Sequence, residues 1–91
     1  KMKLESVLVK NNLSGEETVL PLDGLFVAIG KEPQNEIFAE VTELDENGYI
    51  EADESCKTST DGIYAAGDCR TKAFRQLTTA AADGTVAALS P

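Results

Sequence analysis

The sequence predicts an α/β chain, which taken by itself has the element content of an α+β protein. Three patterns carry this prediction. Two short strand-like segments flank a polar turn near the start, residues 25–29 are all apolar, and apolar residues after position 74 recur at helical spacing. The expected elements are therefore β-hairpins, one buried strand and one C-terminal helix.

The first twenty residues are expected to form a β-hairpin. Apolar side chains largely alternate in residues 2–9, and residues 17–20 form a second strand-like segment that ends at Pro21. Residues 11–16 between them contain two Asn and one Gly, which tolerate the left-handed backbone conformations of a tight turn.

The apolar run at residues 25–29 has no polar face. Such runs are typical of strands that helices cover on both sides of a parallel sheet. Pro33 prevents a helix directly after the run. We expect one helical turn in residues 35–40, with Ile37 and Phe38 as its anchors.

A second turn is predicted at residues 45–48, Asp-Glu-Asn-Gly, between strand-like residues 41–44 and 49–52. A short apolar strand at residues 63–66 should then end at Gly67-Asp68.

The last helix is expected to run from residue 74 or 75 to residue 90. Gly84 within it costs about 1 kcal/mol relative to Ala, so we expect a sheet or a ligand to approach it closely. The predicted inward face consists of small or apolar residues, namely Leu77, Ala80, Ala81, Gly84, Ala87 and Ala88.

Composition narrows the classes of function. Eight basic and sixteen acidic residues give a net charge of −8, which disfavours nucleic acid and anionic membranes as partners. No apolar run approaches the ~20 residues that span a bilayer, and the start shows no signal-peptide pattern, so a cytoplasmic location is expected. The basic residues Arg70, Lys72 and Arg75 form a cluster that suits a solvated loop and a binding site about equally.

The two cysteines, Cys56 and Cys69, form no C-x-x-C pair, and the chain contains no His. We expect both to be free thiols with a structural role. The sequence also has no glycine-rich phosphate loop and no metal-ligand cluster.

One unit remains as a candidate site: the predicted strand, Gly67-Asp68, a loop and the helix. Ligands commonly bind at the carboxyl end of a parallel strand. Asp68 could accept hydrogen bonds from a sugar-like hydroxyl, Gly67 would let a ligand approach without a Cβ, and the helix N-terminus would favour negative charge. Asp68 could equally cap a turn, and the residues alone leave both possibilities open.

The chain resembles a known family at four places, in the order of the family's own sequence. Residues 63–68, Ile-Tyr-Ala-Ala-Gly-Asp, resemble the second FAD-contacting motif of the disulfide reductases that have two dinucleotide-binding domains. Residues 74–84 resemble the helix that follows it in thioredoxin reductases. Residues 26–33 resemble the strand ending in G-x-x-P, and residues 58–62 match the T-S-x-x-G lead-in. Gln34 departs from the family, in which Asn often follows the proline directly.

The resemblance implies pieces of two Rossmann-like domains. Residues 1–34 would be the end of the NADPH-binding domain, and residues 35–91 the C-terminal part of the FAD-binding domain. The implied cofactor-binding residues are Gly67, Asp68, Arg75, Gln76 and Leu77. In the family, the residue matching Asp68 binds the ribityl chain of FAD, and those matching 75–77 meet the pyrimidine side of the isoalloxazine.

The implied function is that of an NADPH-dependent thioredoxin-disulfide reductase, a homodimer that passes electrons from NADPH through FAD to a Cys pair and on to thioredoxin. The chain lacks the redox Cys pair and the NADPH motif, so we expect it to be a C-terminal fragment that is inactive alone. A ferredoxin/flavodoxin–NADP reductase and a peroxiredoxin-linked reductase are alternatives, although Arg75-Gln76 favours thioredoxin reductase. A further alternative is a non-catalytic module that oligomerises by exchanging strands.

Overall fold

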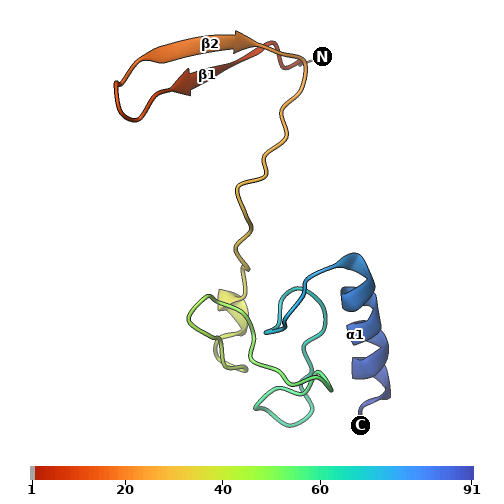
Figure 1. Cartoon of the computed structure of the whole chain (residues 1–91). Coiled ribbons are helices and arrows are strands. Elements are labelled where there is room, and N and C mark those ends of the chain that lie inside the picture. The colour runs from red at the N-terminus through yellow and green to blue at the C-terminus, as the bar shows by residue number, and fades with distance from the viewer. Residues whose placement is uncertain (1) are drawn as a thin grey trace. The chain divides into compact units, whose positions relative to one another are not determined.

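The computed structural model describes residues 2–91, which fall into two compact units, one ending at Gly30 and one running from Lys31 to Pro91. Its elements are the strands β1 (Ser6–Lys10) and β2 (Glu17–Pro21), the 3-10 helix η1 (Glu36–Phe38) and the helix α1 (Leu77–Leu89) (Figure 1). The division falls four residues before the 34/35 boundary that the family resemblance implies. Assignment of the units to two nucleotide-binding domains stays a prediction.

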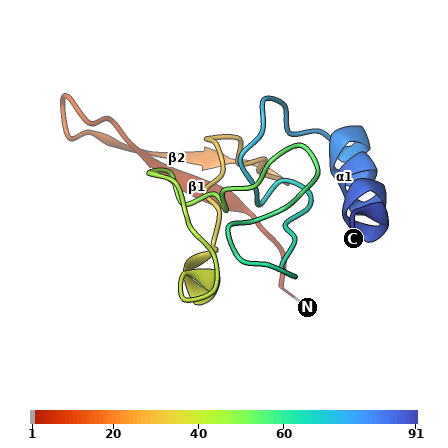
Figure 2. The same ribbon diagram turned by 90° about the horizontal axis from the view of Figure 1, so that it is seen from below.

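The first unit contains the expected hairpin. β1 and β2 pair antiparallel, with Ser6 opposite Pro21 and Lys10 opposite Glu17 (Figure 2). In the connecting turn, the Asn11 side-chain oxygen accepts a hydrogen bond from the Leu13 N–H at 2.9 Å. Gly15 has φ +75°, a conformation that glycine adopts at little cost. The hairpin prediction is confirmed, and local turn chemistry accounts for it.

The prediction of a buried strand at residues 25–29 is wrong. The segment has no strand partner and is solvent-exposed: Phe26 is 100% exposed and Ile29 92%. A strand that is apolar on both faces needs neighbouring strands and a covering layer. The described part of the first unit offers only the two-stranded β1–β2 sheet, so the run stays uncovered.

The helical turn expected in residues 35–40 is present as η1, but its anchor is polar. Ile37 is 80% exposed and Phe38 is 43% exposed. The buried residue is Asn35, whose Nδ2 donates to the Gly48 carbonyl at 3.0 Å and to the Cys69 carbonyl at 2.9 Å. Two hydrogen bonds to distant loops thus hold this turn where apolar burial was expected.

The other expected strands of the second unit are reduced to isolated bridges. Leu44 pairs with Ile50 antiparallel, Ile50 with Arg70 parallel, and Lys57 with Tyr64 antiparallel. Side-chain hydrogen bonds compete with longer ladders. In the turn at residues 45–48, which the sequence correctly predicts, Asp45 Oδ1 accepts from the Tyr49 N–H at 2.9 Å.

Helix α1 begins two to three residues later than expected, and a different face packs inward. Leu77 is 91% exposed, and nothing lies within 4 Å of a Cβ built on Gly84. The close approach expected at Gly84 is therefore absent among the described residues. The buried or half-buried helix positions are Thr79, Ala80, Asp83, Val86 and Ala87. The face turns toward Asp83 because that carboxylate binds cations of the loop before the helix. No helix in the described range is long and apolar enough to span a membrane.

Candidate functional site

The loop of residues 67–72 is fastened to α1 through one carboxylate. Asp83 Oδ2 accepts hydrogen bonds from the Gly67 N–H at 3.0 Å, from Arg70 Nε at 2.8 Å and from Lys72 Nζ at 2.8 Å. Its Oδ1 accepts a second bond from Arg70, from Nη2 at 3.0 Å. Asp83 therefore fixes three points of a six-residue loop.

The ion cluster lies away from solvent. The side chains of Arg70, Lys72 and Asp83 are 2%, 4% and 10% exposed. The hydrogen bonds from Arg70 and Lys72 lower the pKa of Asp83 well below its usual value, and the same bond to Asp83 raises the pKa of Arg70. The interpretation of the basic cluster as a solvated loop is wrong for Arg70 and Lys72, because both side chains are buried. Their charges are balanced by the Asp83 carboxylate, as buried charges require.

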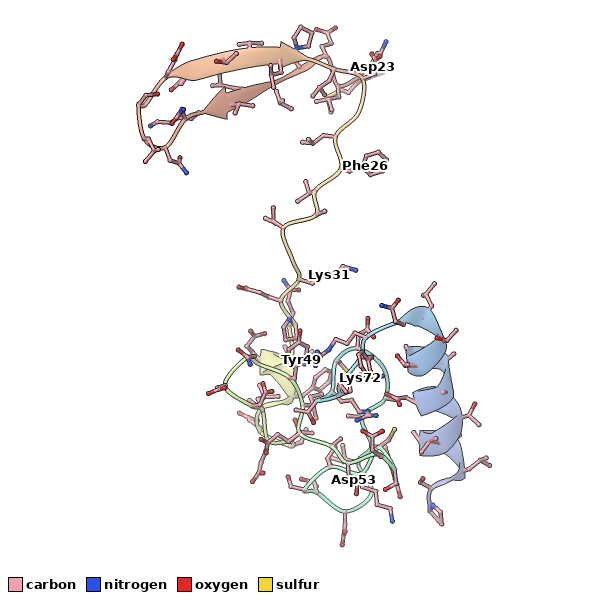
Figure 3. The ribbon with its side chains drawn as sticks, viewed as in Figure 1. Asp23, Phe26, Lys31, Tyr49, Asp53 and Lys72 are labelled. Carbon is pink, nitrogen blue, oxygen red and sulfur yellow. The ribbon has the colours of Figure 1, made fainter. Side chains whose placement is uncertain are left out.

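Arg75 ties the end of the loop back to its beginning. Its Nε donates to the Asp68 carbonyl at 3.1 Å, and its Nη2 donates to the Arg70 carbonyl at 2.9 Å. The guanidinium also lies 3.5 Å from the centre of the Tyr49 ring, an attractive cation–π arrangement. Figure 3 shows the labelled Tyr49 and Lys72 in the looped part of the second unit.

A groove of about 540 Å³ opens beside this loop. Asp68, Cys69 and Arg75 form one part of its wall. The rest of the wall comes from Tyr49 and from residues 31–35, which lead into η1. Asp68 is an exposed residue, so its carboxylate is accessible to a ligand in the groove. An accessible carboxylate, an arginine and an aromatic ring thus share one concave surface.

The structure separates the five predicted site residues into three positions. Asp68 and Arg75 meet at the groove. Gly67 is buried behind it with φ +93°, and a Cβ there would face Ala80 of α1 at 3.8 Å. The backbone conformation thus gives a reason for this glycine that involves no ligand. Gln76 and Leu77 are exposed where α1 begins and do not line the groove. Cofactor binding by all five stays a prediction.

Sequence reasoning missed Asp83, Tyr49 and Asn35. One signal could have located Asp83: it stands at helical spacing from Ala80 and Ala87, on a face otherwise made of small residues. An acidic residue in such a face indicates a buried partner. Nothing in the local pattern distinguishes Tyr49 or Asn35 from ordinary turn residues.

Both cysteines are free thiols, as expected. Cys56 is fully buried, its Sγ donates to the Asp83 carbonyl at 3.5 Å, and burial raises the pKa of its thiol. Cys69 is half-buried, with Sγ 3.4 Å from the Ala66 carbonyl. The described residues contain no cluster of three or more side chains suited to hold a metal ion.

Comparison with known proteins defines the family. The sequence model of the pyridine nucleotide-disulphide oxidoreductases matches residues 2–84. The chain belongs to this family.

Within this family, the relatives most often named among the similar proteins are thioredoxin reductases. The chain is 45% identical over 92 residues to the thioredoxin reductase of Peptoclostridium litorale, covering 94% of this chain and 29% of that protein. It is 48% identical over 87 residues to a "34.2 kDa protein in rubredoxin operon" of Clostridium pasteurianum, covering 96% and 28%.

Solved structures agree with these relatives. Thioredoxin reductase from T. acidophilum superposes with a TM-score of 0.72 at 40% identity, covering 94% of this chain and 29% of that one. The Lactococcus lactis enzyme gives 0.69 at 42% identity, covering 92% and 28%. The chain thus spans somewhat over a quarter of the length of the proteins it matches.

Proposed function

We propose that this chain forms the flavin-facing part of an NADPH-dependent thioredoxin-disulfide reductase. The proposal rests on one observation: Asp68 and Arg75 line the same groove, and Arg75 Nε donates a hydrogen bond to the Asp68 carbonyl. Family membership and the thioredoxin reductase relatives support the same activity.

The residues present are suited to a flavin. The exposed Asp68 carboxylate can accept hydrogen bonds from ribityl hydroxyls, and Gly67 holds the backbone turn that presents it. Arg75, Gln76 and Leu77 lead into the first turn of α1, whose N–H groups favour negative charge on the reduced flavin. FAD, when bound, would carry electrons from NADPH toward a disulfide.

The redox-active cysteine pair and the NADPH-binding loop that this reaction requires are not part of this chain. It has no C-x-x-C pair and no glycine-rich NADPH loop. We propose that residues 1–34 belong to an NADPH-binding domain and residues 35–91 to an FAD-binding domain of a cytoplasmic homodimer whose substrate is thioredoxin. The names of the relatives favour thioredoxin over ferredoxin, flavodoxin or peroxiredoxin as the acceptor.

A chimera tests this function. The matching segment of the Bacillus subtilis thioredoxin reductase, 40% identical over 88 residues, would be replaced by this chain. We expect the chimera to retain FAD and to reduce thioredoxin with NADPH. The 91-residue chain alone should reduce no DTNB with NADPH.

Asp68→Ala in the chimera should weaken FAD binding by about 1.5–3 kcal/mol, the typical worth of a hydrogen bond to a charged group. Asp61→Ala is the matched control, because Asp61 is also an exposed loop carboxylate but lies outside the groove. FAD content and its dissociation constant are the measurements. A chimera that folds but purifies without flavin would refute the proposal.

A further inference from the structure

We propose that Asp83 is the positioning residue of this site: from the middle of α1 it holds the 67–72 loop, and so sets Asp68 and Arg75 relative to the start of the helix. The proposal rests on the proposed flavin function of the site.

The contacts of Asp83 bracket Asp68 in the sequence. Gly67, immediately before Asp68, donates its N–H to Asp83 Oδ2 at 3.0 Å. Arg70, two residues after Asp68, binds both carboxylate oxygens, at 2.8 and 3.0 Å. The Gly67 backbone before Asp68 and the Arg70 side chain after it are thus bound to one carboxylate, so the freedom of Asp68 to move relative to α1 is small.

A second set of bonds continues from Arg70 to the helix start. The Arg70 carbonyl accepts from Arg75 Nη2 at 2.9 Å, and Arg75 Nε donates to the Asp68 carbonyl at 3.1 Å. Arg75 is followed by Gln76, the extended N-cap residue of α1. A chain of contacts thus runs from Asp83 to Arg70, from Arg70 to Arg75, and from Arg75 to the start of α1. Both ends of this chain lie on the same helix, and the loop lies between them.

No other acid of the described cluster can take over this role equally well. Glu54 contacts Arg70 at 3.4 Å, but its side chain is 89% exposed. The Arg70 and Lys72 side chains are almost fully buried, and a buried cation that loses its partner is strongly unfavourable. Without the Asp83 carboxylate, both cations would move toward water and carry the loop with them.

The test uses two measurements: NMR on the complete ¹⁵N-labelled chain, and FAD binding by the chimera with the Bacillus subtilis thioredoxin reductase. Amide hydrogen exchange at Gly67 of the chain reports on the loop, and titration of the flavin-free chimera with FAD reports on the site. In Asp83→Asn we expect Gly67 exchange and the FAD dissociation constant of the chimera each to rise at least about tenfold, the factor for loss of one charged hydrogen bond. Glu54→Gln removes a carboxylate contact to the same arginine and should change neither.

The outcomes are distinguishable. If Asp83→Asn leaves the FAD dissociation constant unchanged, the proposal is wrong, whatever happens to Gly67. If the chimera with the unchanged chain folds but binds no FAD, the flavin function itself fails and the positioning proposal falls with it, while Gly67 exchange still reports whether Asp83 holds the loop.

A second variant covers loss of folding. Should Asp83→Asn expose the buried Cys56 thiol to DTNB at the rate of unfolded chain, Asp83→Glu replaces it, because it keeps the charge and moves the carboxylate by one methylene. We expect a folded protein with fast Gly67 exchange and weakened FAD binding. Fast exchange with wild-type FAD affinity would overturn the proposal.

Discussion

Single residues of the second unit reverse the usual distribution of polarity. Measured over the whole residue, Arg70 is 1% exposed and Asp83 is 7% exposed, whereas Ile37 is 80% exposed and Leu77 is 91% exposed. The buried apolar residues among those described are only Ile50, Cys56 and Ala65. With so little apolar burial, the ion cluster should contribute a large share of local order, and stability should depend on pH.

We expect the chain to lose stability in acid through Asp83. Its pKa is lowered in the folded state by Arg70 and Lys72, so the folded state favours the ionised form. That contribution is complete above the ordinary Asp pKa of about 3.9 and is lost as pH falls from there toward the lowered value. Burial raises the pKa of the neighbouring Cys56 thiol, so that group stays protonated in this range and does not reverse the sign.

Urea unfolding followed by circular dichroism at about pH 5 and about pH 2.5 measures this loss. Glu54→Gln should keep the wild-type dependence, whereas a folded Asp83 variant without the charge should show a flatter one. Equal unfolding midpoints at the two pH values in the wild type would contradict the prediction.

Asp68 and Arg75, which line the groove, could be selected from the sequence, but Asp83, which holds their loop, could not. Helical periodicity assigns an Asp to the solvent side by default, because Asp is rarely buried without a partner. The charged partners of Asp83, Lys72 and Arg70, lie 11 and 13 residues earlier, in a loop whose path no local pattern describes. Pairing at that separation depends on tertiary structure.

The elements differ in how far they could be predicted. The hairpin follows from turn chemistry within a few residues, so its position was predicted well. The position of η1 was also predicted, but the hydrogen bonds from Asn35 to distant loops that hold it were not. The strands expected at residues 25–29, 41–44, 49–52 and 63–66 needed neighbours, and propensity cannot supply a neighbour. Helix α1 was predicted, but its inward face was shifted because the Asp83 ion pairs outweigh the packing of small side chains.

Two glycines in or beside α1 should respond oppositely to alanine. Gly67 has φ +93°, so Gly67→Ala should destabilise the chain by about 1–3 kcal/mol. Gly84 lies inside the helix, and a Cβ added to it would meet nothing within 4 Å, so Gly84→Ala should stabilise the chain by about 1 kcal/mol. Urea unfolding of both variants measures these changes, and a Gly67→Ala chain as stable as wild type would contradict this explanation of Gly67.

The whole chain consists of two units with unequal means of stabilisation. The second has buried ion pairs and hydrogen bonds between distant loops, such as those of Asn35. The first has one two-stranded sheet, and such a hairpin is only marginally stable in water. It also carries the apolar run at residues 25–29, in which Phe26 is fully exposed.

We therefore expect the isolated 91-residue chain to self-associate through residues 25–29, as in the oligomerising alternative drawn from the sequence. An exposed apolar segment with unpaired backbone groups is a site for strand pairing between copies. Light scattering should show an average mass that rises with protein concentration. The double variant Phe26→Asp, Ile29→Asp should stay monomeric, because charge on the segment opposes pairing.

Leu13→Asp is the matched control for this prediction. Leu13 is also 100% exposed but stands alone in the hairpin turn, so its replacement should leave association unchanged. Added FAD should likewise leave the mass unchanged, because the groove residues belong to the second unit. A mass that falls with FAD would place the contact between copies at the groove, and a monomer at all concentrations would show that the apolar run does not drive association.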